Sequence, residues 1–169
     1  MAAPQPFTES EIRLLCALLR HKVKFMVVGL SAATLQGAPV VTQDVDLWFE
    51  KLGDPIIARA LQEVGAAYVP PSHLNPPMLA GPGAELFDIV LRMDGLGTFA
   101  DEARNCIRIP LGRHRLKVLR LDRILASKRA ANRPKDQLAI PVLEDALAVT
   151  QASRARQKRA QRTRRASQK

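Results

Sequence analysis

The sequence predicts a small mixed α/β (α+β) domain, in which helices pack on one mixed sheet, followed by a basic C-terminal tail. Short β-branched runs alternate with segments of helical periodicity, and two apolar runs near Gly112 are spaced like a hairpin. This mixture favours helices packed on a sheet. The 169 residues suffice for one domain with a substantial core and are too few for two. We therefore expect a folded domain over residues 1–149 and a flexible tail over 150–169.

The first elements are expected to be a helix, a strand and a short helix. Thr8 is followed by acidic residues, and leucines then recur at helical spacing, which predicts an amphipathic helix over residues 8–21. The run "KFMVVG" predicts a strand that ends at Gly29. The small residues after it suit a short helix closed by Gly37.

A strand, a helix and an irregular segment are expected next. The run "DVDLWFE" at 44–50 predicts a strand whose aromatic residues belong to the core. The run "DPIIARALQEVG" predicts a helix with Pro55 in its first turn and Gly65 at its end. Residues 66–84 contain five prolines, so regular structure is not expected over most of that stretch.

The second half is expected to complete the sheet and to end in helices. The run "LFDIVLRM" predicts a strand, and "CIRIPLG" and "RLKVLRL" predict a hairpin that turns near Gly112. Helical patterns follow in "LDRILASKRAAN" and in "DQLAIPVLEDALAVT". Pro141 inside the last segment predicts either a kink or a later helix start.

The net charge of +10 is concentrated at the C-terminus. Residues 150–169 hold eight basic and no acidic residues, whereas the other 149 residues hold 18 basic and 16 acidic ones. A self-repelling run without an apolar stripe predicts disorder, or at most a fraying extension of the preceding helix. It is either an arm that raises affinity for RNA or DNA, or a solubilising tail.

Several classes of protein are disfavoured by composition. The apolar runs are too short to span a bilayer, and acidic residues stand where a secretory signal would be basic. We therefore expect a cytoplasmic protein. Cys16 and Cys106 are expected to be free thiols. The three histidines are scattered without ligand spacing, which argues against zinc.

Three carboxylates interrupt the predicted strands. Asp44 and Asp46 are two residues apart, so they share one face of a strand, and Asp88 lies inside another apolar run. Each acid by itself could be a cap or a salt-bridge partner. Two carboxylates about 4 Å apart repel by roughly 4 kcal/mol at an effective dielectric near 20, so a shared site requires a cation. Oxygen ligands favour Mg²⁺ or Mn²⁺ over zinc.

The sequence around these acids resembles a known family. The stretch "VGLSAATLQGAPVVTQDVDLWF" is similar to the minimal nucleotidyltransferases of the DNA polymerase beta superfamily. The closer likeness is to the small nucleotidyltransferases of bacterial toxin-antitoxin and abortive-infection systems, with a core of approximately "VGG-x-A…HG-x-x-R-x-T-x-D-[ILV]-D". The positions that match are Gly29, Ala32, Gly37, Thr42, Asp44 and Asp46. The run "LDRILASKRAANRPKDQLAI" resembles that family's lysine-bearing helix followed by an Arg-x-Lys-Asp segment.

The resemblance implies catalytic roles for the three acids. Asp44 and Asp46 would bind the metal ions that position a nucleoside triphosphate. Asp88 would complete the site and orient the attacking hydroxyl. Gly29 and Ser31 would contact the β and γ phosphates.

The resemblance also implies roles for basic residues of the second motif. Lys128 would neutralise charge on the triphosphate. Arg133 and Lys135 would hold phosphates of the acceptor or the nucleotide, or else form a solvated helix end. Asp136 is interpreted as a helix cap.

The implied function is transfer of a nucleoside monophosphate to a hydroxyl of a tRNA-like RNA or of a protein, the latter as in a toxin-antitoxin pair. Two departures from the pattern favour an alternative. Leu30 replaces the second glycine, and Val40 replaces a basic residue. The alternative is a catalytically impaired fold that binds nucleic acid or a partner protein.

Overall fold

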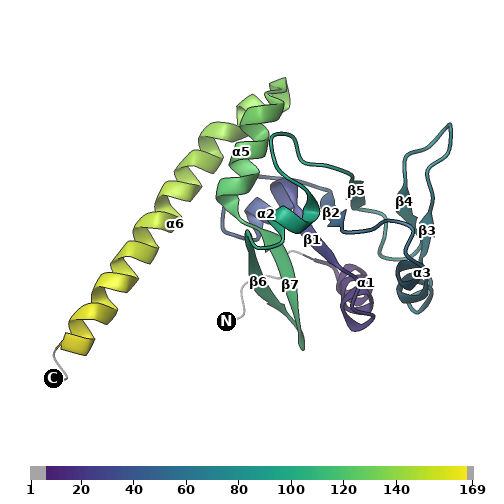
Figure 1. Ribbon diagram of the computed structural model, residues 1–169, viewed down its shortest axis with the longest axis horizontal. Coiled ribbons are helices and arrows are strands. Elements are labelled where there is room, and N and C mark those ends of the chain that lie inside the picture. Colours follow the sequence, from purple (N-terminus) through teal and green to yellow (C-terminus); the bar gives the residue numbers. More distant parts are fainter. Residues whose placement is uncertain (1–6, 167–169) are drawn as a thin grey trace.

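A computed structural model describes residues 7–166, and its centre is a five-stranded mixed sheet (Figure 1). The strand order is β5-β2-β1-β7-β6. Strand β1 pairs antiparallel with β2 and parallel with β7, β2 pairs parallel with β5, and β6 pairs antiparallel with β7. The strands are β1 (Phe25–Val28), β2 (Val45–Phe49), β5 (Phe87–Val90), β6 (Cys106–Leu111) and β7 (His114–Leu119). The predicted mixed α/β architecture and the hairpin at Gly112 are confirmed.

The helices form where local patterns place them. Thr8 and Glu11 form a capping box at the start of the first helix, and Asp54 caps the third helix, with Pro55 in its first turn. These side chains satisfy backbone N–H groups that have no partner within the helix. The helices are α1 (Glu9–Arg20), α2 (Gly29–Thr34), α3 (Pro55–Gln62), α4 (Phe99–Glu102), α5 (Leu121–Ala131) and α6 (Pro134–Ala166).

The core lies around strands β1 and β2. Every residue of β1 is buried, and so are Leu47, Trp48 and Phe49 of β2. Phe49 packs on Phe25 with ring centroids 5.8 Å apart, and Trp48 meets Phe99 edge to face at the same separation. The predicted core role of the aromatic residues after the aspartates is confirmed. This packing holds β2 rigidly where the carboxylates lie.

The proline-rich segment contains structure that the sequence did not predict. Strands β3 (Ala67–Val69) and β4 (Met78–Ala80) form an antiparallel two-stranded ribbon, visible as a projection in Figure 1. Four of the five prolines lie between the two strands and one follows them, so no proline interrupts their ladder. Tertiary contacts of β3 with α3 and of β4 with β5 support the ribbon.

The C-terminal segment is helical up to Ala166, so of the two alternatives expected for the tail the extension of the preceding helix holds and disorder does not. Helix α6 begins at Pro134, contains Pro141 and continues through the basic residues to Ala166. Its first part packs on α5, which provides a nucleus. Adding a residue to an existing helix costs much less than starting one, and Ala, Arg, Lys and Gln have high helix propensity. Residues 167–169, also expected in the tail, lie outside the described residues.

The cysteines and the helices were both the subject of expectations from composition. Both cysteines are free. Across residues 7–166, none of the helices has the length and apolarity needed to cross a membrane.

Candidate functional site

The paired carboxylates of the site lie on adjacent parallel strands. Asp46 on β2 is directly opposite Asp88 on β5, and it is opposite Val28 on β1. Directly opposed residues of neighbouring parallel strands, which lie about 4.8 Å apart, point to the same face of the sheet. The structure therefore brings Asp46 and Asp88 together, beside the end of β1 where Gly29 follows Val28.

Asp46 is held in an environment that opposes its charge. Its burial, followed by the negative charges of Asp88 and Asp44, raises the pKa of Asp46 to about 6. The positive charges of Lys128 and Lys135 act in the opposite direction and are too weak to cancel the increase. Fold stability alone gives no reason to place carboxylates this way, which is typical of a functional site.

Gly29 is required beside Asp46 for two reasons. Its φ is +65°, a left-handed conformation that favours glycine. A Cβ atom at this position would lie 1.9 Å from Oδ2 of Asp46. The backbone at the start of α2 and the carboxylate can therefore approach each other only if residue 29 has no side chain.

Ser31 fixes the turn that carries Gly29. Its hydroxyl donates to the carbonyl of Val28 at 2.9 Å and accepts from the backbone N–H of Asp46 at 3.2 Å. Ser31 is buried, so the hydroxyl ties α2 to β1 and β2. Its implied contact with phosphate stays a prediction, and it would require the hydroxyl hydrogen to leave Val28.

Asp136 anchors two of the implied phosphate-binding residues. Its carboxylate is completely buried and accepts from Nζ of Lys128 at 2.7 Å and from Nε of Arg133 at 2.6 Å. It also accepts from the backbone N–H of Arg133 at 3.3 Å. Asp136 lies in the first turn of α6 and bonds back to the residue before the helix, whereas the sequence predicted it as the cap residue itself. Despite its burial, the hydrogen bonds from Arg133 and Lys128 lower the pKa of Asp136 to about 2.

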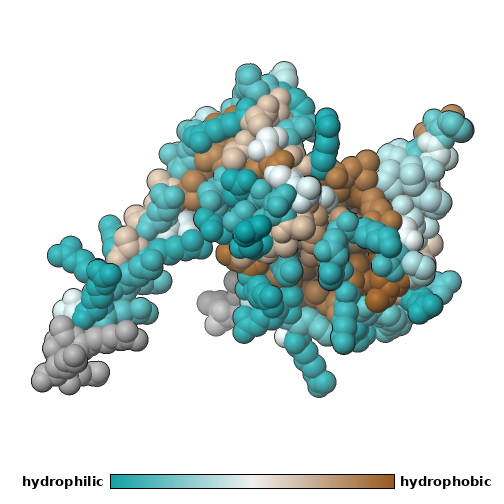
Figure 2. All heavy atoms as spheres, in the orientation of Figure 1, coloured by the Kyte–Doolittle hydropathy of each residue, from teal (hydrophilic) through white to brown (hydrophobic). Residues whose placement is uncertain are grey.

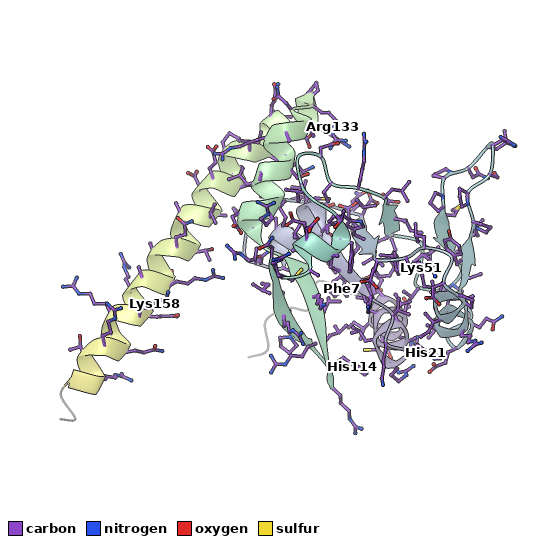
Figure 3. The ribbon with its side chains drawn as sticks, in the orientation of Figure 1. Phe7, His21, Lys51, His114, Arg133 and Lys158 are labelled. Carbon is purple, nitrogen blue, oxygen red and sulfur yellow. The ribbon has the colours of Figure 1, made fainter. Side chains whose placement is uncertain are left out.

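The helix ends that flank the turn between α5 and α6 carry basic residues whose charges act on Asp46. Lys128 is mostly buried, while Arg133 is half exposed at the top of the turn (Figure 3). Lys135 is exposed and lies close enough to lower the pKa of Asp46. The ion-pairing role of Asp136 was missed in the sequence, where the short spacing "RPKD" indicated only a cap.

Asp44 is the outermost of the three acids. It is exposed, and its charge contributes to the raised pKa of Asp46. Within residues 7–166, no three His, Cys, Asp or Glu side chains are gathered closely enough to hold a metal ion as they stand. The structure thus supports the pair Asp46 and Asp88 directly, and the three-carboxylate set stays a prediction.

A cavity of about 360 Å³ is lined by Asp44, the only one of the three site acids that borders it. It is lined by segments far apart in the sequence, including the start of α1, the middle of α2 and the residues before β2. Sequence reasoning missed it because no local pattern connects these segments. The lining residues are Phe7, Thr8, Glu11, Ser31, Thr34, Leu35, Thr42, Gln43, Asp44, Val45 and Leu86.

Comparison with known proteins agrees with this geometry at the level of the fold. No protein-family model and no curated protein matches the sequence. A crystal structure of ANT(2")-Ia in complex with adenylyl-2"-tobramycin is similar with a TM-score of 0.52 at 16% identity, covering 85% of this chain and 94% of that chain. A solution structure of the antibiotic-resistance factor ANT(2'')-Ia is similar with a TM-score of 0.50 at 13% identity, covering 89% and 94%.

Both of these proteins are aminoglycoside nucleotidyltransferases. The chain has a nucleotidyltransferase fold. The similarity to the first of these structures extends over 85% of this chain.

Proposed function

We propose that this chain is a metal-dependent nucleotidyltransferase that transfers a nucleoside monophosphate from a nucleoside triphosphate to an acceptor hydroxyl. The observation that carries the proposal is that Asp46 and Asp88 lie side by side on adjacent strands, with Gly29, the residue directly after β1, packed against Asp46. The site thus combines a glycine without a side chain and two neighbouring carboxylates on a nucleotidyltransferase fold.

The donor set fits a hard divalent cation. Asp46 and Asp88 supply only oxygen atoms, their charges repel, and Asp44 adds a third negative charge nearby. Mg²⁺ or Mn²⁺ is the appropriate ion for such ligands. When bound, the ion supplies charge neutralisation for the triphosphate.

The remaining groups bind and orient the reactants. Gly29 leaves room for phosphates beside Asp46, and Lys128 and Lys135 offset negative charge on the triphosphate. Asp88 is exposed and orients the attacking hydroxyl. In the transfer, the acceptor oxygen forms a bond to the α phosphorus while the bond from that phosphorus to the bridging oxygen breaks. Pyrophosphate leaves, and the hydroxyl proton is released to solvent.

Three classes of acceptor are consistent with these observations. The sequence resemblance favours a tRNA-like RNA or the hydroxyl of a partner protein in a toxin-antitoxin pair. The adenylylated tobramycin bound to ANT(2")-Ia adds small hydroxylated molecules. The cavity beside Asp44 has room for part of a substrate.

The proposal is tested by supplying each α-labelled triphosphate with Mg²⁺, and in turn with cellular RNA, cellular protein and a panel of small polyhydroxylated molecules. Label should enter one acceptor pool with the wild type and none with Asp46→Asn. The matched control is Asp145→Asn, which removes an exposed acid on α6. Absence of label in every pool from folded protein would overturn the proposal.

A non-catalytic nucleic-acid or partner-binding fold is the second candidate. Leu30 and Val40 depart from the family pattern, and the hydroxyl of Ser31 is already engaged with Val28. Calorimetric titration with a triphosphate and Mg²⁺ separates the two candidates. The enzyme binds the triphosphate in a manner that depends on Asp46, whereas the non-catalytic fold binds it weakly and is unaffected by Asp46→Asn.

A further inference from the structure

The last part of α6 is an exposed basic helix, which we call the basic arm (residues 150–166). Figure 1 shows it extending beyond the sheet, and Figure 2 shows it as a largely hydrophilic surface. The described basic side chains of the arm form no ion pair. The last acid before the arm in the sequence is Asp145. The exposed basic residues are Arg154, Arg156, Lys158, Arg159, Arg162 and Arg164.

The helical form arranges several of these charges in a row. Arg154, Lys158 and Arg162 are spaced four residues apart, so they follow one side of the helix at intervals of about 6 Å. Like charges at this spacing destabilise a helix. Lys158 lies far from the sheet (Figure 3), so the domain does not compensate its charge. A polyanion along the row would remove the repulsion.

The composition of the arm distinguishes between classes of polyanionic partner. Beyond Val149, its only apolar side chains are those of alanine. A helix that lies in a membrane surface needs large apolar residues on one face. A protein interface needs apolar or aromatic anchors in a core depleted of charge. The arm has neither, whereas contacts to nucleic-acid phosphates require only Arg, Lys and amide donors.

We propose that the basic arm binds the phosphate backbone of RNA or DNA without selecting a sequence. Arg154, Lys158 and Arg162 contact successive phosphates, and Gln157 and Gln161 lie close to the same side of the helix as further donors. The binding neutralises the row and stabilises the helix. It does not depend on nucleotidyl transfer, because the arm lies outside the carboxylate site.

The test measures binding of the full chain to a labelled 24-nucleotide RNA by fluorescence anisotropy at several salt concentrations. The triple variant R154Q/K158Q/R162Q should bind at least tenfold more weakly at 0.1 M salt. Each phosphate contact on a single strand contributes about 0.7 to the slope of log K against log salt, so the slope should become shallower by about 2. An unchanged slope overturns the proposal.

The matched control removes three exposed arginines from the β6–β7 hairpin, in the variant R108Q/R113Q/R115Q. Its net charge equals that of the arm variant, so equal weakening in both would show that net charge, and not the arm, governs binding. Circular dichroism of each variant confirms that the domain remains folded.

Two further ligands test the recognition itself. DNA of the same length should bind within tenfold of RNA, and stronger discrimination would indicate base or ribose contacts that the arm does not supply. Polyglutamate of equal charge should compete much less well than RNA. Equal competition would show that any acidic chain occupies the arm, and it would overturn the assignment to nucleic acid.

Discussion

Gly29 and Asp46 approach so closely that a Cβ on residue 29 would lie 1.9 Å from Oδ2 of the carboxylate. The substitution Gly29→Ala should therefore displace Asp46 or the start of α2. We expect it to lower the free energy of unfolding by more than the roughly 1–2 kcal/mol of left-handed strain and to abolish triphosphate binding. Urea unfolding and calorimetric titration check the two effects.

The control for Gly29→Ala is Gly53→Ala. Gly53 has a similar φ of +78°, but a Cβ there meets no atom within 4 Å. Gly53→Ala should lower the free energy of unfolding only by the cost of the left-handed backbone conformation, and it should keep full triphosphate binding. In the Asp46→Ala background, Gly29→Ala should become less damaging, because the carboxylate that it meets is gone. Additive effects of the two substitutions would contradict the steric account.

Asp46→Asn should stabilise the metal-free protein. Burial and neighbouring acids raise the pKa of Asp46 from 3.8 to about 6, so the folded state disfavours its charge at every pH above 3.8. The stability that the wild type loses through this charge grows from pH 3.8 to about pH 6 and is constant above it. At pH 8 the free energy of unfolding of Asp46→Asn should therefore exceed that of the wild type by up to about 3 kcal/mol. Thermal unfolding in EDTA measures this gain.

Addition of Mg²⁺ should make the wild type more stable than Asp46→Asn. The wild type gains stability from an ion that binds only the folded state, whereas Asp46→Asn gains much less. Asp44→Asn, which removes an exposed acid, should show a smaller gain in EDTA. If Mg²⁺ shifts the melting temperature of wild type and Asp46→Asn equally, Asp46 does not hold the ion.

Asp136 should make the free energy of unfolding depend on pH in the acidic range. Arg133 and Lys128 lower the pKa of Asp136 from 3.8 to about 2 in the folded state. This stabilisation is complete above about pH 5 and is lost as the pH falls towards 2, amounting to about 2 kcal/mol. Urea unfolding of Asp136→Asn at pH 7, 5, 4 and 3 should show a flatter dependence than the wild type.

At pH 7 the same variant should be destabilised by about 3–5 kcal/mol, because one partner of a buried ion pair has been removed. It should also weaken triphosphate binding, since Lys128 loses its anchor. Asp145→Asn serves as the exposed control and should retain the wild-type pH dependence. A variant Asp136→Asn with normal stability at pH 7 would contradict the ion-pair account.

Glu102 should be the acid most important for holding α4 against α5. It is only 2% exposed and accepts from Nη2 and Nε of Arg123 at 2.6 and 2.9 Å, and from Asn105 at 3.0 Å. Replacing Glu102 by Ala leaves a charged donor unpaired and should cost about 3–5 kcal/mol. Chemical denaturation of the purified variant measures the loss.

The exposed pair Arg129 and Glu144 provides the comparison. Both side chains are about half exposed, so Glu144→Ala should cost less than about 1 kcal/mol. Similar losses in the two variants would show that burial does not set the strength of these pairs. Neither substitution should alter triphosphate affinity, because neither residue is part of the carboxylate site.

Much of the fold follows from local patterns in the sequence. The capping residues Thr8 and Asp54 and the turn at Gly112 act within a few residues, so their elements could be predicted without knowledge of the rest. The ribbon of β3 and β4 could not, because its strands are short and depend on contacts with α3 and β5. The sequence left disorder and an extension of the preceding helix open for the arm, because the start of that helix is nucleated by packing on α5, which no local pattern shows.

The candidate site divides in the same way. The sequence by itself determined that Asp46 lies on a strand and that Gly29 directly follows one, because apolar β-branched runs mark both strands. Asp44 was expected on the same strand face, but β2 begins at Val45, one residue after it. Only the tertiary structure decided that Asp88 lies directly opposite Asp46 and that Asp136 holds Lys128. Strand order and helix packing bring these distant residues together, and they are set by the burial of the whole core, which no local pattern contains.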